Sequence, residues 1–307
     1  MTAIKLGRKQ RHPLPSLKIG KHRIRFHRPS FAKIMLYLFL TAMVIFCGLP
    51  LFAMVCRALM PLDELYLYPP RLIVQKPTFR NFTDLLTSLS SSTVPFTRYI
   101  FNSLFTTVVT VVASIIVCCL GAYGLVKHKP AGANLIFGIV VAALSFSTHV
   151  TTIPNYLVVN ELGLVNTYLA LIIPKIAVAY NFFLVKQFCE QLPDSILEAA
   201  RIDGAGHMTV FTRIVIPTSV PTIGALGILQ FLAKWNDFLY PKIMITKMEY
   251  KPIMVILPTL TEGGDTAGIP YDLVLAGCTL VVIPMIVVFF CLQDKFLQSV
   301  TLGSVKG

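Results

Sequence analysis

Five side chains that can carry charge, form hydrogen bonds or stack on a sugar ring lie within or beside long apolar stretches of the sequence. They are His149, Lys175, Trp235, Asn236 and Asp237. A charge deep inside an apolar stretch, as at Lys175, is costly and usually faces a cavity or a partner. Trp235, followed by an amide and a carboxylate, suits stacking and hydrogen bonding to a sugar. These five residues predict a polar pathway for a solute.

Each of these residues also has an alternative interpretation that involves no solute. Lys175 could form an ion pair with a partner subunit, or its ammonium group could extend to the membrane interface if the apolar stretch is shifted. His149 and the threonines around it could form hydrogen bonds between helices. Trp235 could anchor a helix at the interface. The residue types alone leave these alternatives open.

Motifs for hydrolysis and for nucleotide binding are absent from the sequence. It contains no G-x-x-x-x-G-K-[ST] phosphate-binding loop and neither H-E-x-x-H nor G-x-S-x-G. The seven cysteines form no C-x-x-C pair and lie mostly in apolar stretches, which indicates buried thiols and not a metal site or a disulfide framework. We therefore expect a protein that is not an enzyme, has no ATPase site of its own and needs no metal or cofactor.

Residues 191–207 have the pattern of a short, capped helix between two apolar stretches. Ser195 and Glu198 fit a capping box, in which the two side chains satisfy unpaired N–H groups at the start of a helix. Gly204 and Gly206 suit its end, because glycine takes the left-handed conformation that a C-terminal cap needs. A helix of about ten residues is marginal by itself in water, so we expect it to pack against another surface.

One face of this predicted helix indicates what packs there. Ile196, Ala199, Ala200 and Asp203 recur at a spacing of three and four residues and therefore share a side. The two alanines allow another surface to come close. A helix lying on lipid headgroups would instead favour large apolar residues with Lys or Arg on its polar face. The pattern predicts a helix that a protein partner grips.

The remainder of the chain provides the elements that must position these residues. Of its 307 residues 55% are hydrophobic and 13% are charged, about half the charged fraction of a typical soluble domain. Six stretches approach or exceed the roughly 20 apolar residues that a helix needs to cross a bilayer. These stretches are 34–56, 99–126, 131–158, 164–185, 214–233 and 273–293. None alternates as a membrane β-strand would, so the predicted fold is an all-α integral membrane protein with six transmembrane helices.

Lysine and arginine are distributed unevenly around the six stretches. Residues 1–33 contain ten of the 27 basic residues and no acidic residue, and the loops on the same side bring the total to 17, against nine on the other side. The positive-inside rule then places both termini in the cytoplasm. We expect the basic arm 1–33 to contact anionic lipid and not nucleic acid, because no nucleic-acid-binding module accompanies it. A membrane domain at 34–293 and a cytoplasmic tail at 294–307 complete the predicted organisation.

The short helix and the residues after it carry a resemblance to a known family. The run Glu198-Ala199-Ala200-x-x-Asp203-Gly204-Ala205 is followed by Phe211, Ile214, Pro217 and Pro221. It resembles the EAA loop of permease subunits of binding-protein-dependent ABC importers, here at 186–213. The resemblance implies a type I permease fold in which this helix docks into a cleft on an ATPase subunit. It also implies the coupling residues, which are Glu198, Ala199, Ala200, Asp203 and Gly204.

Two further segments narrow the resemblance. Residues 231–241 and the glycine-containing end at 299–307 are similar to sugar permeases related to the smaller permease subunit of the maltose transporter. This implies a bacterial inner-membrane subunit that forms half of a carbohydrate pathway with a second permease. Its other partners would be two ATP-binding subunits and an extracytoplasmic sugar-binding protein. The glycine-containing loop 259–270 would enter that binding protein, or would be a flexible connector.

An ion-coupled secondary transporter is the alternative function from another class. Such a transporter would need carboxylates within its spans to bind the coupling ion, together with internal repeats. None of the six apolar stretches contains an aspartate or a glutamate. The sequence therefore favours the ATP-driven importer.

Overall fold

The computed structural model describes residues 31–69, 71–88, 94–262 and 271–304, and every regular element among them is a helix. The chain divides into two compact units, residues 1–49 and 50–307. Most of the basic arm 1–33 and most of the glycine-containing loop 259–270 lie outside the described residues. The all-helical prediction is confirmed for the part of the chain that the structure describes.

Within the described ranges, three helices are long and apolar enough to cross a membrane by themselves, and their mean hydropathy is 2.4 to 2.8. They are α1 (Phe31–Ala58), α4 (Phe96–Tyr123) with its continuation η2 (Gly124–His128), and α16 (Tyr271–Ser304). They match the predicted stretches 34–56, 99–126 and 273–293. Helix α16 continues without a break through most of the segment 294–307 that we expected to be a separate tail.

The other three predicted spans are bent. They consist of α5 (Ala133–Ala143) with α6 (Thr148–Glu161), of α7 (Tyr168–Ile172) and η3 (Ile173–Lys175) with α8 (Ala179–Gln191), and of residues 207–218 with α12 (Val220–Trp235). The bends are 110°, 40° and 73°, respectively. Prolines at 174, 217 and 221 lie at the second and third bends. Proline cannot donate the hydrogen bond that continues a helix, so a helix tends to bend or break where it occurs. If each bent pair counts as one span, the described residues contain the six spans that the sequence predicts.

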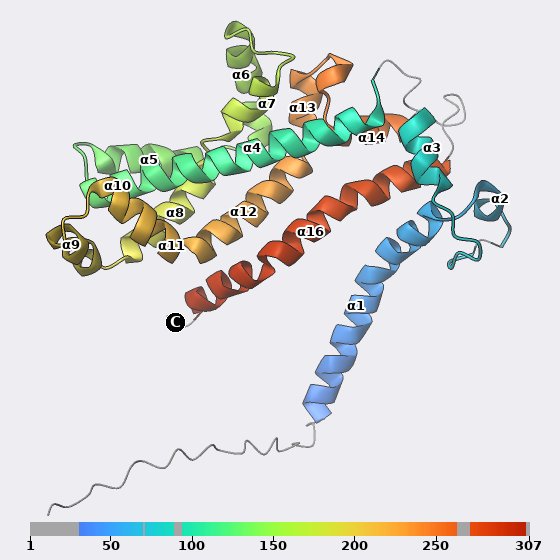
Figure 1. Ribbon diagram of the computed structural model, residues 1–307, viewed down its shortest axis with the longest axis horizontal. Coiled ribbons are helices and arrows are strands. Elements are labelled where there is room, and N and C mark those ends of the chain that lie inside the picture. Colours follow the sequence, from blue (N-terminus) through green and yellow to red (C-terminus); the bar gives the residue numbers. More distant parts are fainter. Residues whose placement is uncertain (1–30, 70, 89–93, 263–270, 305–307) are drawn as a thin grey trace, which may run out of the picture. The chain divides into compact units, whose positions relative to one another are not determined.

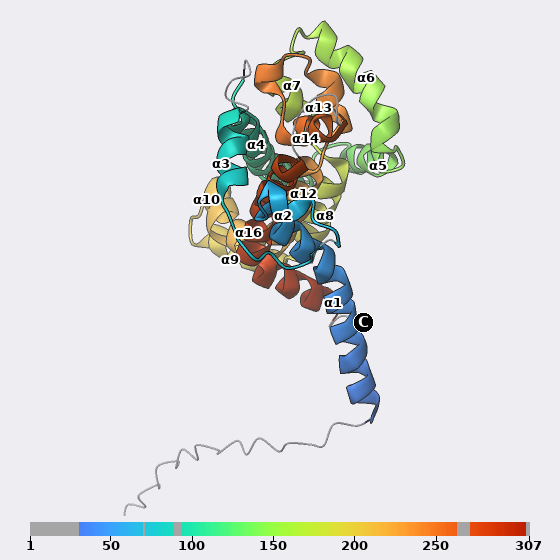
Figure 2. The ribbon, with the colours of Figure 1, turned by 90° about the vertical axis from the view of Figure 1, so that its right-hand side faces the viewer.

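Shorter helices occupy the connections between these spans. They are α2 (Leu62–Leu65), α3 (Arg80–Ser88), α9 (Asp194–Ile202), α13 (Leu239–Met244), η5 (Met248–Tyr250) and α14 (Ile253–Glu262). Residues 207–218, the first half of the third bent span, consist of α10 (His207–Val210), η4 (Phe211–Val215) and α11 (Ile216–Thr218). Within residues 50–307, α12 packs against both α4 and α16, and α8 packs against α4 (Figures 1 and 2). Helices α4, α8, α12 and α16 therefore bury side chains against one another, although many of their outward side chains remain apolar.

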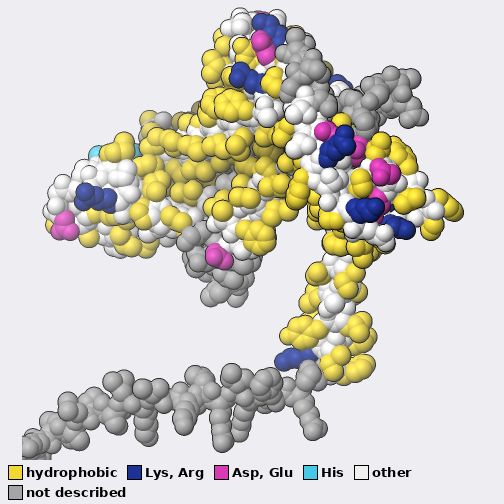
Figure 3. Space-filling view, turned by 45° about the vertical axis from the view of Figure 1, so that its right-hand side comes forward, with side chains coloured by type: hydrophobic (Ala, Val, Ile, Leu, Met, Phe, Trp, Pro, Cys, Tyr) yellow, Lys and Arg dark blue, Asp and Glu magenta, His cyan; other side chains and the backbone are white. Residues whose placement is uncertain are grey.

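The surface of the long helices is suited to lipid. Large apolar side chains such as Val112 on α4 and Phe290 on α16 are more than half exposed. Figure 3 shows hydrophobic side chains along the helices of residues 50–307, whereas charged side chains gather mainly at their ends. A protein in water would not leave so much apolar surface uncovered. The chain is a multi-pass membrane protein.

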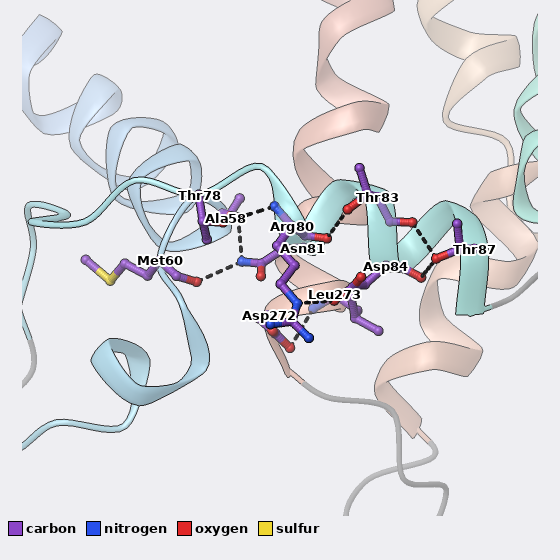
Figure 4. A network of polar contacts seen from close by, with 10 residues as sticks. All are labelled: Ala58, Met60, Thr78, Arg80, Asn81, Thr83, Asp84, Thr87, Asp272 and Leu273. Atoms are coloured by element: carbon purple, nitrogen blue, oxygen red, sulfur yellow. Dashed lines mark hydrogen bonds and ion pairs between the residues drawn. The ribbon is translucent and has the colours of Figure 1, made fainter.

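A buried asparagine connects the end of α1 to α3 within the second unit. The side-chain amide of Asn81 donates hydrogen bonds to the carbonyl groups of Ala58, at 2.8 Å, and Met60, at 2.7 Å (Figure 4). The neighbouring Arg80 forms an exposed ion pair with Asp84 at 3.2 Å. Because α3 also packs against α16, this network holds the chain that follows the first span close to the last span.

Candidate functional site

The helix predicted at the EAA-like segment is present, but its start differs from the prediction. Helix α9 begins at Asp194, its N-cap is Pro193, and no side chain makes a capping hydrogen bond there. Ser195 therefore lies inside the first turn, and the capping box that we predicted for Ser195 and Glu198 is wrong. An N-cap side chain has to precede the helix to reach its free N–H groups. Asp194 supplies negative charge at the positive end of the helix dipole instead.

The end of α9 follows the prediction at Gly204. This residue has φ of +82°, in the left-handed region. Its N–H donates a hydrogen bond to the Arg201 carbonyl at 3.0 Å, and the N–H of Ala205 donates to the Ala200 carbonyl at 2.9 Å. These two bonds form a Schellman cap, which turns the chain sharply away from the helix. We expected Gly206 to help end α9, but it instead lies at the N-cap of α10, with φ of −69°.

One face of α9 is packed and the other is open. The Leu197 side chain is 4% exposed and joins a hydrophobic cluster with Val210 and Phe211. Ala200 is half-buried against this cluster. The remaining residues with implied coupling roles, Glu198, Ala199, Asp203 and Gly204, are exposed. The sequence pattern had placed Ala200 with Ala199 on one open face, whereas the structure turns Ala200 partly toward the core.

Apart from Ile196, the exposed apolar side chains around α9 were not identified from the sequence. Ile202 is 86% exposed, and Ile196 and Met208 are at least half exposed. Side chains of this size are normally buried, and a group of them beside polar residues marks a protein-binding surface. The sequence did contain a signal for the exposure of Ile202. This residue follows Leu197 by five positions, so on a helix it lies away from the face that Leu197 buries.

A lysine at the end of the second span holds the start of α9. The ammonium group of Lys127 donates to the Leu192 carbonyl at 2.7 Å and to Asp194 Oδ1 at 2.8 Å. Next to it, the rings of His128 and His207 lie 4.7 Å apart. In the sequence, Lys127 is only one of the 17 basic residues counted on the side that we predict to be cytoplasmic. The structure shows that it joins the α4–η2 span to the EAA-like helix, so a displacement of α9 would act directly on that span.

The contact between Lys127 and Asp194 predicts a dependence on pH. Its hydrogen bond and its charge lower the pKa of the exposed Asp194 carboxyl. A lowered pKa in the folded state stabilises the fold fully above the unfolded-state value of about 3.9, and the effect is lost as the pH falls through the folded-state value. We expect hydrogen exchange at α9, corrected for intrinsic rates, to stay slow down to about pH 4 and to accelerate below it. Asp194→Asn should exchange faster throughout, without this transition, and a transition that persisted in the variant would contradict the assignment.

A second candidate site is a polar cavity of about 370 Å³ between α6, η3 and α12. It contains two of the predicted pathway residues, Lys175 and Asp237, with the Lys175 ammonium 3.7 Å from Asp237 Oδ2. Lys175 also lies 4.4 Å from the centre of the Tyr240 ring. The other lining residues are Thr148, Thr151, Asn155, Pro174, Ala177, Val178, Gln230, Ala233 and Lys234. Lys175 thus pairs within its own chain, an arrangement that the sequence alternatives did not include.

The other three predicted pathway residues do not line this cavity. Trp235 is 2% exposed, stacks on Phe231 and donates its indole N–H to the Val281 carbonyl at 3.2 Å. It therefore joins α12 to α16 in the core. Asn236 is exposed and donates to Leu232 in its own helix. The exposed His149 lies at the start of α6, where the nearby threonine hydroxyls bond within the same helix and not between helices.

Sequence reasoning missed a second lysine at the cavity. Lys234 is 7% exposed, and its ammonium donates to the Leu171 carbonyl at 3.0 Å. Its spacing of four residues from Gln230 places the two side chains on one face of α12. That spacing was visible in the sequence, but the predicted span ended one residue earlier, at 233. Gln230 is itself fixed, because it accepts from Asn181 at 2.8 Å and donates to the Lys175 carbonyl at 3.2 Å.

Comparisons with known proteins agree with this architecture. The family described as "Binding-protein-dependent transport system inner membrane component" matches residues 28–302. The chain is 29% identical to the arabinooligosaccharides transport system permease protein AraQ of Bacillus subtilis (strain 168), over 92% of this chain and 99% of AraQ. It is 28% identical to the polygalacturonan/rhamnogalacturonan transport system permease protein YtcP of the same strain, over 89% of this chain and 97% of YtcP.

A solved structure has the same fold. It is a chain from the crystal structure of a bacterial ABC transporter involved in the import of the acidic polysaccharide alginate. The TM-score is 0.74, and the match covers 86% of this chain and 95% of that chain at 22% sequence identity. The fold described above is therefore one already observed in a chain of a membrane transporter.

Proposed function

The chain belongs to the family of binding-protein-dependent transport system inner membrane components, and from this we propose that it is a permease subunit of an ATP-driven carbohydrate importer. Similarity to sugar ABC permeases extends over nearly the whole chain. In this proposal the chain forms half of the translocation pathway with a second permease subunit. Two ATP-binding subunits and an extracytoplasmic sugar-binding protein complete the assembly, both termini of the chain are cytoplasmic, and lipid surrounds the spans.

The observation that carries the proposal is the two-sided character of α9. Leu197 and Lys127 attach this helix to the membrane domain, while Ala199 and the exposed Ile202 face outward. A helix arranged in this way can transmit movement, because a partner bound to the outer side displaces the spans attached to the inner side. We assign that partner as the ATPase subunit.

The five residues of the EAA-like motif then have separate roles. The small side chain of Ala199 lets the ATPase approach the helix backbone, and Glu198 and Asp203 supply exposed charges for complementary contacts. Ala200 and Gly204 hold the Schellman cap that fixes the end of the helix. ATP binding would close the ATPases, move α9 and open the pathway outward for the sugar.

A carbohydrate cargo is supported by the relatives and by the cavity. AraQ and YtcP are named for the transport of arabinooligosaccharides and of polygalacturonan or rhamnogalacturonan. The cavity beside α12 offers hydroxyl, amide and charged groups, which are the groups that bind sugar hydroxyls. We therefore propose that cargo passes along this side of α12.

Purification of the chain from its native membrane in mild detergent tests the proposal. We expect mass spectrometry to identify a second permease and an ATPase with a phosphate-binding loop, and we expect a sugar-loaded binding protein to stimulate ATP hydrolysis. Ala199→Arg should lose the ATPase during purification, whereas Thr209→Arg, at an exposed position after α9, should retain it. Recovery of the chain alone, with sugar uptake driven by an ion gradient, would favour the secondary-transporter alternative.

A further inference from the structure

The cavity between α6, η3 and α12 has a charge that indicates the chemical class of its ligand. We propose that it binds the anionic group of an acidic sugar, a carboxylate or a phosphate, between Lys175 and Lys234. This inference rests on the proposed function and makes it more specific. It assigns to this subunit a direct contact with cargo and a preference for charge.

The charged groups that line the cavity do not cancel. Lys175 and Lys234 contribute two positive charges, and Asp237 contributes one negative charge. Asp237 lies 3.7 Å from the Lys175 ammonium, and no ion pair among the described residues includes Lys234. With both lysines protonated, the lining therefore carries one net positive charge, and the side chains of Lys175, Lys234 and Asp237 are each less than one-fifth exposed.

The environment of the Lys234 ammonium supports an anionic ligand more strongly than the net charge of the lining does. Its side chain is almost fully buried, and the acceptor that the structure shows for its ammonium group is the Leu171 carbonyl. An ammonium group has three donors, so one carbonyl does not saturate it. Asp237 is the one carboxylate among the lining residues, and it pairs with Lys175, so the two lysines share a single counter-charge. An incompletely neutralised buried charge is costly, and an anion that enters the cavity would lower that cost. A cavity with this lining thus favours an anionic ligand over a neutral one.

The two lysines are held in place before a ligand arrives. The centre of the Tyr240 ring lies 4.4 Å from the Lys175 ammonium and 5.9 Å from that of Lys234, so both cations are near one aromatic ring. Gln230 donates to the Lys175 carbonyl and is therefore a positioning residue for η3. The neutral groups of Thr148, Thr151 and Asn155 complete the lining and suit sugar hydroxyls. A volume of about 370 Å³ lies within the usual range for small-molecule sites.

An uptake assay with three radiolabelled probes tests the inference in cells that carry the chain with its partner subunits. The probes are digalacturonate for a carboxylate, sn-glycerol 3-phosphate for a phosphate, and arabinobiose as a neutral sugar. We expect the wild type to import at least one anionic probe. Lys175→Gln and Lys234→Gln should each raise the KM for that probe at least tenfold, while the KM for any neutral probe it imports changes less than twofold. The anionic probe that responds identifies the carboxylate or the phosphate as the ligand group.

Matched variants separate this role from a structural one. Lys234→Arg keeps the positive charge and should retain most of the anionic uptake, and Lys242→Gln changes an exposed lysine outside the cavity and should have no effect. Immunoblots of membranes show whether each variant is inserted. Because Lys175 is less buried than Lys234, Lys175→Gln carries the test if Lys234→Gln does not accumulate.

Three results would overturn the inference. They are a wild type that imports neither anionic probe, lysine variants with unchanged anionic uptake, and variants in which anionic and neutral uptake fall together. The last result would assign the lysines to packing or to a contact with the partner permease. The ATPase activity of the purified assembly tests the proposed function separately. If the assembly hydrolyses ATP and imports only neutral sugars, the proposed function stands and the anionic site is refuted.

Discussion

Replacing Gly204 with aspartate should leave the protein in the membrane and reduce sugar uptake at least tenfold. Gly204 has φ of +82°, a left-handed conformation that aspartate, like asparagine, adopts at less than the usual cost of about 1–2 kcal/mol for a side chain. A carboxylate there would also meet the negative end of the dipole of α9 and the neighbouring Asp203. No atom lies within 4 Å of the added Cβ, so the effect would come from conformation and charge and not from a clash. The effect is measured as sugar uptake per membrane-inserted protein and as the ATPase activity of the purified assembly.

Three control variants separate the possible causes of this loss. Gly204→Asn is tolerated in the left-handed region and adds no charge, so it should retain most of the uptake. Gly204→Val adds strain without charge and should be as harmful as aspartate. Gly206→Ala, at a glycine with φ of −69° and open space around it, should behave as wild type. Normal uptake by both Gly204→Asp and Gly204→Val would count heavily against a coupling role for the end of α9.

Replacing Trp235 with alanine should destabilise the membrane domain by about 3–5 kcal/mol, the usual cost of removing a buried aromatic side chain. The indole is 2% exposed, stacks on Phe231 and donates to the Val281 carbonyl, so its loss leaves a cavity between α12 and α16. Trp235→Phe keeps most of the packing and should cost only about 1 kcal/mol for the hydrogen bond. Thermal unfolding of the purified assembly in detergent should rank the variants in this order.

The same variants decide between the two interpretations of this tryptophan. If Trp235 is a core residue, uptake should follow stability, and Trp235→Phe should transport nearly as well as wild type. If the indole stacks on cargo, Trp235→Phe would be stable but would bind sugar less tightly. A stable phenylalanine variant with strongly raised KM would therefore contradict the core assignment and return Trp235 to the pathway.

The bends in the spans show how far local sequence patterns extend. Apolar length identified all six stretches, because the requirement to cover about 30 Å of hydrocarbon is local to each segment. The 110° turn between α5 and α6 was not predicted, since no proline lies between Ala143 and Thr148. Prolines at 217 and 221 were visible, but their position alone did not give the 73° change of direction. The packing of neighbouring helices determines such angles.

By itself, the sequence determined the membrane class, the short helix α9 and its left-handed end at Gly204, because apolar length and glycine conformation act within a few residues. Only the tertiary structure showed that Lys127 holds Asp194, which lies 67 residues away along the chain. The same is true of Lys175, Lys234 and Asp237 around one cavity. Side chains on different helices meet only when the packing of the spans brings those helices together, and a single sequence carries no local signal of that distance. The tertiary structure alone therefore reveals the net charge of the cavity.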